Sequence, residues 1–250
     1  CFSPEEYVVL NWCEELPGIP HSDAIVAERL EEMGFTYTGS AADVLRLSWE
    51  KASVKRLLEA NRLPTPAWRI FDRADPGDWP CYPAIVKPAH EHCSLGVNTE
   101  AVVLNREELH NRIAYILDVH RQPALVEEFI DGREFLVSAW GNGKVTMLPV
   151  AEIDYGAFTD IRDRLFTFEA KYVPGSRIDE GIDLRVPTEL DPAARAALTQ
   201  LVLATYKAAG CRDYGRIDLR YRDGVFYIID VNPNPDINPL TSLTYAAAEE

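Results

Sequence analysis

The pattern of predicted secondary structure changes near Glu134, and this change most constrains the fold. Before it, short apolar runs alternate with amphipathic stretches, beginning with a buried parallel strand at Tyr7–Leu10 and a helix that Ser22 caps and Gly34 ends. After it, longer strands with alternating side chains are joined by Gly-containing turns. The sequence therefore predicts an α/β part followed by an α+β part.

Hydrophobic periodicity and turn residues place the elements of each part. The first helix is expected to bury a stripe of Ile25, Val26, Leu30 and Met33. The other elements predicted for the first part are a helix over Ala42–Ala60, strands at Ala84–Val86 and Ala101–Leu104, a helix near Glu107–Asp118 and a strand at Ala124–Glu128. The second part is expected to contain a hairpin of Glu134–Trp140 and Lys144–Ile153, a long polar segment from Asp154 to Thr188, a helix from Asp191 to Gly210 and a hairpin of Arg216–Tyr221 and Val225–Val231.

The chain is acidic and has few cations. Its 250 residues include 40 Asp and Glu against 25 Lys and Arg, a formal net charge of −15, so the electrostatic footprint of a nucleic-acid partner is missing. No apolar run approaches the length that spans a membrane, so no membrane partner is expected. Five scattered cysteines without a C-x-x-C pair favour a reducing cytoplasm. Any phosphate ligand must therefore be held by a few local cations.

A first candidate site combines a strand with a loop of small residues. The apolar run before Lys87 delivers this lysine to the strand end, and Ser94, Leu95 and Gly96 follow in the loop. Backbone N–H groups of such a loop can cradle a phosphate, and a lysine supplies a point charge. A purely structural turn is the alternative, because the glycines are too few for the known phosphate-loop fingerprints.

A second candidate site lies around the turn at Asp131-Gly132, which Glu127 and Glu134 flank. One carboxylate could accept a hydrogen bond from an exocyclic amine and the other from ribose hydroxyls. A solvated acidic bend is the alternative interpretation. Only the order of this stretch relative to the other candidate sites decides between a nucleotide-binding pair of carboxylates and a solvated bend.

The third candidate site is the last hairpin. Arg216 and Asp218 share one face of a strand, and Asp230 and Asn232 end the next strand. Aspartate and asparagine oxygens are hard ligands of the kind that Mg²⁺ prefers when it also holds phosphates. A carboxylate that directly follows a buried apolar strand is costly unless it is paired or bound to a metal. Solvated charges at strand ends are the alternative.

The register of this hairpin carries a further prediction. A two-residue loop at Asp223-Gly224 with regular pairing would place Asp218 and Asp230 on opposite faces, because a slip of one residue inverts every side chain. If both aspartates bind one metal, either the loop is effectively longer or a bulge intervenes. Gly224 is expected at positive φ.

These three stretches, in this order and spacing, resemble the ATP-grasp superfamily and, within it, the D-alanine–D-alanine ligase branch. Further motifs of that branch match Phe35–Ser40, Glu50-Lys51 with Lys55, Leu63–Pro66, Glu169–Tyr172, Cys211–Asp218 and Asp230–Pro235, so the match runs from about Tyr7 to Thr241. The resemblance implies an ATP-grasp fold, in which two α+β lobes sandwich ATP, preceded by a partial N-terminal parallel α/β domain. The expected boundaries are 1–47 for this remnant, 48–127 for the small lobe and 128–250 for the C-terminal lobe.

The resemblance also implies roles for individual residues. Around ATP it places Lys51 and Lys87 at the α- and β-phosphates, the Ser94-Leu95-Gly96 loop over the phosphates, Lys171 at the terminal phosphate, Glu127 and the Ile130 backbone at the adenine, Glu134 at the ribose, and Phe129 and Ile229 elsewhere at the nucleotide. The resemblance makes Asp218, Asp230 and Asn232 the ligands of two Mg²⁺, with Mn²⁺ as the alternative metal. It assigns catalysis to Arg216 and Lys171, and it assigns contacts with the substrate to Tyr172, Arg216, Asp236 and Thr241.

The implied activity is that of a cytoplasmic ATP-dependent ligase. It joins a small-molecule carboxylate, as in an amino acid or a dipeptide-forming pair, to an amine through an acyl phosphate and so forms a peptide-like C–N bond. Relatives often dimerise through the N-terminal domain, so a homodimer is expected despite the loss of most of that domain. The alternatives are an ATP-binding pseudoenzyme or regulatory module, and a truncated, inactive ligase that lacks its substrate lobe.

Three departures from the family pattern bear on these alternatives. Asp230 stands where the family has Glu, which shortens its reach. Asp236 replaces a glycine near the expected position of a substrate carboxylate, a repulsion that speaks against simple D-alanine. The chain starts at Cys1, close to a predicted strand and without the first strand–loop–helix units of the family, so it is expected to lack its own beginning.

Overall fold

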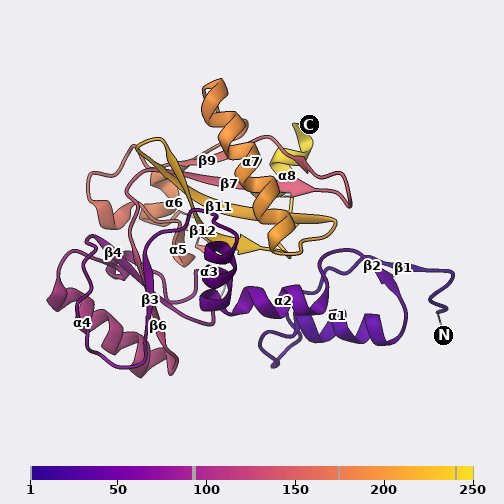
Figure 1. Ribbon diagram of the computed structural model, residues 1–250, viewed down its shortest axis with the longest axis horizontal. Coiled ribbons are helices and arrows are strands. Elements are labelled where there is room, and N and C mark those ends of the chain that lie inside the picture. Colours follow the sequence, from indigo (N-terminus) through magenta and orange to yellow (C-terminus); the bar gives the residue numbers. More distant parts are fainter. Residues whose placement is uncertain (1, 92–93, 174, 240, 250) are drawn as a thin grey trace.

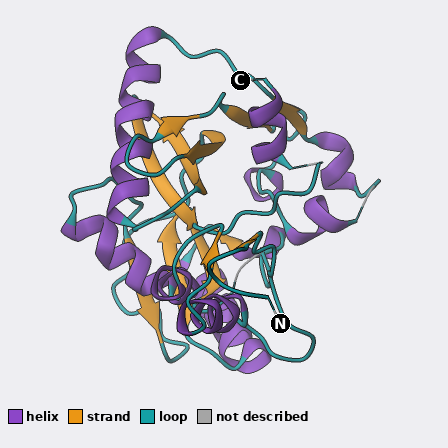
Figure 2. Cartoon of the chain, turned by 90° about the vertical axis from the view of Figure 1, so that its right-hand side faces the viewer, coloured by secondary structure: helices purple, strands orange, loops and turns teal. Residues whose placement is uncertain are grey.

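The protein, described by a computed structural model, has an N-terminal unit, a small lobe and a large lobe (Figure 1). Residues 2–91, 94–173, 175–239 and 241–249 are described, except for the side chain of Tyr172. The strands lie in the middle of the molecule with helices around them (Figure 2). None of the helices within these ranges is long and apolar enough to cross a membrane.

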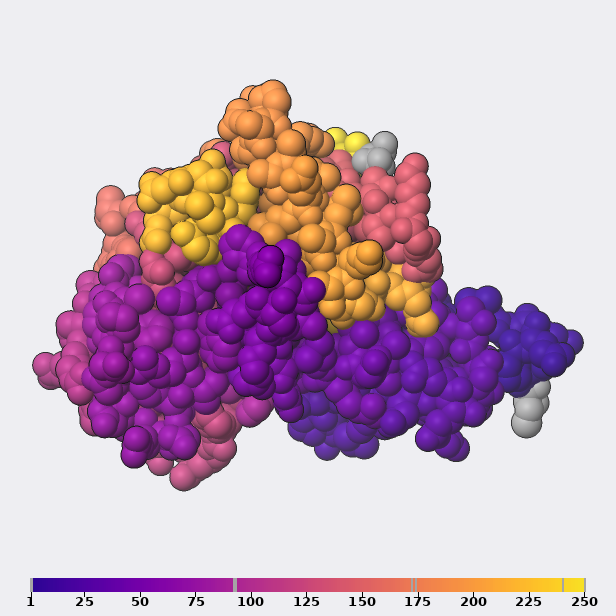
Figure 3. Space-filling model, in the orientation of Figure 1, coloured from indigo at the N-terminus to yellow at the C-terminus, as the bar shows by residue number. Residues whose placement is uncertain are grey.

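The N-terminal unit is a two-stranded parallel sheet with two helices. Its elements are β1 (Val8–Val9), α1 (Asp23–Glu32), β2 (Thr36–Tyr37) and α2 (Ala42–Trp49). The parallel pairing confirms the α/β prediction for this part of the chain. The predicted burial of the first strand is wrong, because Val8 is 68% exposed and Leu10 is 66% exposed. Figure 3 shows the first residues projecting from the body of the molecule.

The buried face of α1 also differs from the prediction. Ala24 and Ala27 face the small core of this unit, whereas Ile25 and Met33 are about half exposed. Small alanine side chains allow the helix to approach the neighbouring elements closely, so Ile25 and Met33 are left outside, whereas Leu30 of the predicted stripe packs against this core. Ser22 precedes the helix as predicted, but its hydroxyl accepts an earlier backbone N–H instead of capping the helix.

The helix predicted over Ala42–Ala60 is two helices, α2 and α3 (Lys51–Ala60), because Glu50 leaves the helical region at φ −98° and ψ 88°. After this break, the backbone N–H of Lys51 donates to Ala89 O at 3.2 Å. Apolar side chains of α3 pack into the core of the large lobe. This helix therefore contacts both lobes, and the break at its start directs Lys51 toward the region between them.

The small lobe is a four-stranded antiparallel sheet covered on one face by helix. In sheet order its strands are β3 (Trp68–Phe71), β6 (Ala124–Glu128), β4 (Ala84–Pro88) and β5 (Val102–Val103), and the covering segments are α4 (Arg106–Tyr115) and the π-helical turn Ile116–His120. Val86 and Val126 pack against the helical layer. Since side chains alternate along a strand, Lys87 and Glu127 point from the opposite face.

The large lobe is built on a longer antiparallel sheet. In sheet order its strands are β10 (Asp183–Arg185), β9 (Ala151–Asp154), β7 (Arg133–Trp140), β11 (Tyr214–Arg222) and β12 (Val225–Asn232), with β8 (Thr146–Met147) paired to the end of β7. Helix α7 (Pro192–Ala208) covers one face with Leu198 and Val202. As predicted, Asp191 caps this helix, accepting two backbone N–H groups at 2.9 and 3.0 Å.

The long polar segment is more ordered than its composition indicates. It contains the 3₁₀ turn Ile161–Asp163 and the short helices α5 (Phe168–Tyr172) and α6 (Arg177–Gly181). The remaining helix, α8 (Ser242–Ala248), lies outside this segment and follows β12. Phe158 and Ile178 belong to an apolar cluster on the outer part of the large sheet. This cluster holds the segment over the sheet face that α7 leaves uncovered.

The predicted irregularity in the last hairpin is confirmed. The turn has two residues, with Asp223 at φ +52° and Gly224 at φ +83°. Pairing is regular up to Leu219 opposite Ile228, and then shifts so that Asp218 pairs with Asp230. The residue skipped on β12 is Ile229, so a β-bulge there returns both aspartates to one face of the sheet.

Candidate active site

A cavity of about 610 Å³ lies between the two lobes and is also lined by the N-terminal unit. The residues from the sequence prediction that line it are Lys51, Lys87, Ser94, Leu95, Glu127, Phe129, Ile130, Glu134, Lys171, Arg216, Asp218, Ile229, Asp230, Asn232, Asp236 and Thr241. Gly96 belongs to the same loop but does not line the cavity, and the side chain of Tyr172 lies outside the described residues. The structure thus brings together groups that are far apart in the sequence.

Glu127 forms the centre of a buried charge cluster on the small lobe. It is 1% exposed, and its carboxylate pairs with Lys87 Nζ at 2.8 Å and with Lys55 Nζ. Burial disfavours its charged form, but the two ammonium groups outweigh burial and lower the pKa of Glu127. Because Lys87 also borders the cavity, this cluster presents a net positive charge to any ligand there. The sequence prediction noted Lys55 within a motif but gave it no role.

Glu134 is held by two residues that the sequence prediction did not single out. Arg220 Nη2 lies 2.5 Å from its carboxylate, and the Tyr155 hydroxyl donates to it at 2.8 Å. Arg220 is 3% exposed and also donates to the Ile130 carbonyl at 3.4 Å. The sequence could have indicated that Arg220 faces the site, since alternation of side chains along β11 places it on the same face as Asp218.

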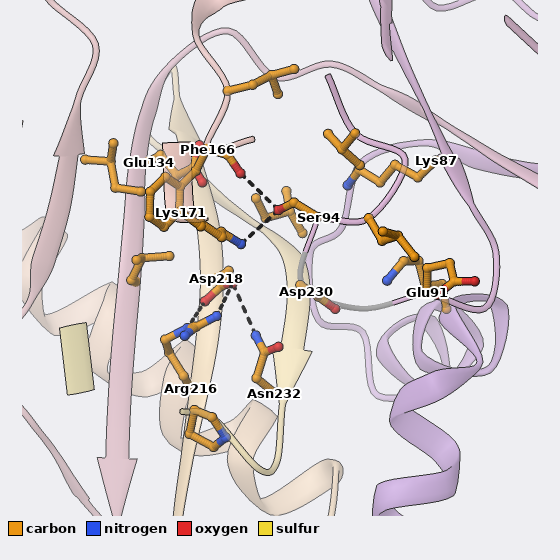
Figure 4. A pocket seen from close by; sticks show the side chains of 18 of the residues that line it. Lys87, Glu91, Ser94, Glu134, Phe166, Lys171, Arg216, Asp218, Asp230 and Asn232 are labelled. Carbon is orange, nitrogen blue, oxygen red and sulfur yellow. Dashed lines mark hydrogen bonds and ion pairs between the residues drawn. The ribbon is translucent and has the colours of Figure 1, made fainter. Parts of the chain in front are cut away.

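The loop of the first candidate site contacts the polar segment of the large lobe. Ser94 donates to the Phe166 carbonyl at 3.0 Å, and Lys171 Nζ donates to the Ser94 hydroxyl at 2.8 Å. Gly96 adopts φ +73°, and a Cβ there would lie 2.8 Å from the His120 ring, so only glycine fits. Figure 4 shows Ser94 of this loop beside Lys171 and Phe166 of the polar segment, so the loop and the segment meet at the cavity that these residues line.

The third candidate site gathers on the bulged hairpin (Figure 4). Arg216 holds Asp218 with two hydrogen bonds, from Nε at 2.6 Å and from Nη2 at 3.0 Å, and Asn232 Nδ2 donates to the same carboxylate at 3.2 Å. Burial raises the pKa of Asp218, an effect that Arg216 opposes and the nearby Asp230 strengthens. Two carboxylates on one sheet face, with one arginine paired to one of them, form a site that favours an added cation.

The donor set fits a hard divalent cation. Asp218, Asp230 and Asn232 offer two carboxylates and an amide oxygen on one sheet face, the ligand chemistry of Mg²⁺. Within the described residues, no group of three or more His, Cys, Asp or Glu side chains is suited to a metal. The predicted set has only two such residues, because its third member is an asparagine that neighbours both.

Two of the predicted substrate residues lie in the loop between β12 and α8. Asp236 is half-buried and accepts the backbone N–H of Asn238 at 2.7 Å. Thr241 Oγ1 lies 2.9 Å from the Asp236 carbonyl and 3.0 Å from the Asn238 carbonyl. The hydroxyl of Thr241 therefore fastens the loop, which leaves only its lone pairs for a ligand.

Comparison with known proteins identifies the family to which this architecture belongs. The family described as "D-ala D-ala ligase C-terminus" matches residues 59–250. The chain belongs to the D-alanine–D-alanine ligase family. The resemblance seen in the sequence motifs is thereby confirmed for most of the length of this ligase-family chain.

Relatives of this D-alanine–D-alanine ligase family member include both a named enzyme and a protein without an assigned activity. It is 32% identical over 237 residues to the D-alanine–D-alanine ligase of a Marinomonas species (strain MWYL1), covering 93% of this chain and 70% of the relative. It is also 32% identical over 242 residues to the uncharacterized protein y4sG of Sinorhizobium fredii, covering 96% of this chain and 69% of that protein.

Solved structures confirm the ATP-grasp prediction at the level of the fold. The D-alanine–D-alanine ligase of Bacillus anthracis, complexed with ATP, matches with a TM-score of 0.71 at 23% identity, covering 90% of this chain and 68% of that one. The VanG D-Ala:D-Ser ligase of Enterococcus faecalis matches with a TM-score of 0.72 at 21% identity, covering 90% and 64%. The domain boundaries expected from the motifs stay a prediction.

Proposed function

We propose that this protein is an ATP-dependent carboxylate–amine ligase that forms a peptide-like C–N bond through an acyl phosphate. The observation that carries the proposal is the composition of the shared cavity. The small lobe presents Lys87 beside Glu127, and the large lobe presents Lys171, Arg216 and the two aspartates of the bulged hairpin. A triphosphate and a divalent cation would be matched by these opposite charges.

The nucleotide would lie with its base near the small lobe. Phe129 and Ile130 are buried apolar residues at that end, and Glu127 and Glu134 are fixed there by their lysine and arginine partners. Lys51 and Lys87 would meet the α- and β-phosphates, while Ser94 and Lys171 close over the terminal phosphate. Positioning and charge neutralisation account for most of the catalysis in phosphoryl transfer, so few reactive side chains are needed.

The donor carboxylate would react beside the hairpin. Two Mg²⁺ held by Asp218, Asp230 and Asn232 would neutralise phosphate charge and act as Lewis acids, with Mn²⁺ as the alternative metal. Arg216 would stabilise the negative charge that develops on the acyl oxygen when the amine attacks. Its guanidinium is already fixed by Asp218, so it requires little reorganisation at that moment. The homodimer and the cytoplasmic location implied by the resemblance stay predictions.

The proposal is tested by turnover with Mg-ATP and a panel of amino-acid donors and amine acceptors. We expect ADP release that requires the divalent cation and both substrates, with one amide formed per ADP by mass spectrometry. The Asp230→Asn variant should lose this activity, whereas Asp72→Asn, at an exposed site outside the cavity, should retain it. Tight ATP binding without any turnover would instead support the regulatory module.

A further inference from the structure

The cavity continues past the hairpin into a region of negative charge. The chain leaves β12 at Asn232, and Asp236 on the following loop lines this region. Glu14 of the N-terminal unit also lines it, and Asn234 Nδ2 donates to the Cys13 carbonyl at 3.2 Å, which holds the two segments together. Partial burial, followed by the charge of Asp236, raises the pKa of Glu14, so these carboxylates lie within electrostatic reach of each other.

This region differs from the nucleotide end in how its carboxylates are compensated. Glu127 and Glu134 pair with lysine and arginine side chains. Across the described ranges of the chain, neither Glu14 nor Asp236 makes an ion pair with a basic side chain. Two neighbouring carboxylates without a cation repel each other, so a cationic group would be bound between them.

An independent observation at Ser242 also points to a polar ligand. This residue opens α8, lines the same cavity and is 5% exposed. Its hydroxyl has no hydrogen-bond partner in the described part of the structure, in contrast to that of Thr241. A buried hydroxyl without a partner is unfavourable, and a ligand ammonium group would provide the missing donor.

The location of this region identifies which substrate would reach it. Lys55 contacts both Glu127 and the Ile228 carbonyl, so that point of β12 marks the nucleotide end. Asn232 lies four residues further along, but because of the bulge at Ile229 this stretch spans only three residues of β11, or about 10 Å of extended strand, and Asp236 lies beyond it. The amine attacks the acyl carbon from above the plane of its carbonyl group, so it must enter through a part of the cavity that the nucleotide does not fill. The acidic region is therefore on the side from which the amine acceptor enters.

We propose that the acceptor is a diamine, whose second amino group stays protonated and is held by Glu14, Asp236 and Ser242. This inference rests on the proposed ligase function and specifies its substrate class. The free amine forms the C–N bond with the acyl carbon, the phosphate leaves with the electron pair of the C–O bond, and the attacking nitrogen releases one proton to solvent. The second ammonium group changes neither its bonds nor its protonation. An amino-acid acceptor would instead bring its carboxylate against Asp236.

The test compares three acceptors, diaminobutane, butylamine and alanine, with the donor that gives the fastest turnover in the panel. We expect kcat/KM for diaminobutane to exceed that for each of the others by about tenfold or more, as one charged contact would produce. Asp236→Asn should reduce the preference over butylamine about tenfold, and Ser242→Ala a few-fold. Neither variant should change the KM for ATP, and Asp72→Asn should change neither quantity.

The outcomes separate this inference from the ligase proposal. Amide formation that is equally fast or faster with alanine would overturn the diamine assignment and leave the ligase function standing. The same holds if Asp236→Asn keeps the full preference while its melting temperature matches that of the unmodified protein. Absence of ADP release with every donor and acceptor would overturn both.

Discussion

In the small lobe one carboxylate is enclosed by two lysines, whereas in the large lobe two carboxylates lie on one sheet face and an arginine pairs with one of them. Glu127 with Lys55 and Lys87 is net positive, and Asp218 and Asp230 with Arg216 are net negative. The first cluster is complete without a ligand, since its charges are buried and paired. The second is incomplete, because burial raises the pKa of Asp218 even with its arginine in place. Under the proposed function, the contrast explains how a chain of net charge −15 would hold a polyphosphate: its positive charge is local, and a metal would supply the remainder.

The largest effect is expected from the incomplete cluster. Asp218→Asn removes one of the two carboxylates, so the divalent cation loses a charged ligand. Turnover should fall on the order of a thousandfold, the equivalent of several kcal/mol of metal-dependent stabilisation. The melting temperature should not fall, because burial of this charge is unfavourable without metal. Initial rates against Mg²⁺ concentration provide the measurement, and an unchanged rate would show that the hairpin does not hold the metal.

The complete cluster should determine stability more than activity. Lys55→Met leaves buried Glu127 with one cation, which should lower the free energy of unfolding by about 3 kcal/mol. Chemical denaturation of the apoprotein measures this change. The double variant Lys55→Met/Glu127→Gln should recover part of the loss, and Lys144→Met at an exposed position should cost nothing. A loss as small as that of the control would mean that the two clusters do not differ in this way.

Lys87 belongs to the complete cluster but also borders the cavity. Its replacement therefore tests whether one lysine both stabilises the cluster and binds the nucleotide. Lys87→Met should raise the Kd for ATP about thirtyfold, which corresponds to about 2 kcal/mol for one charge-assisted contact. The fold should persist, because Lys55 still pairs with Glu127. Isothermal titration with a non-hydrolysable ATP analogue gives the Kd. An unchanged Kd would remove Lys87 from the nucleotide site.

The smallest effect concerns acid stability. The pKa of Glu127 is lowered in the folded protein, so its contribution to stability is present above the ordinary glutamate pKa of about 4.3 and is lost as the pH falls through the lower, folded value. Glu127→Gln should therefore flatten the decrease in unfolding free energy below that pH. Urea unfolding at a series of acidic pH values checks this. A decrease as steep as in the unmodified protein would assign the acid sensitivity to other carboxylates.

The sequence was most informative where a physical requirement tied distant residues together. The need for Asp218 and Asp230 to share a face predicted an irregular pairing, and the bulge at Ile229 supplies it. The cap at Asp191 and the helix that follows were also predicted, but for a different reason, because the cap motif is local in the sequence.

The sequence was least informative where tertiary contacts decide. Periodicity continues across Glu50, so the break that directs Lys51 was not visible. The apolar run at β1 looks the same whether or not another element covers it, and its exposure could not be predicted. Arg220 was missed because its carboxylate partner, Glu134, lies on a strand remote in sequence.

The central claim is that the donor carboxylate is phosphorylated before the amine attacks. Turnover of a donor labelled with heavy oxygen in both carboxylate positions tests this most directly, with the label followed by mass spectrometry of the products. We expect one labelled oxygen in each phosphate released and one in the amide, because phosphate leaves with an oxygen of the donor. Phosphate that carries no label while ADP and amide form would contradict the account.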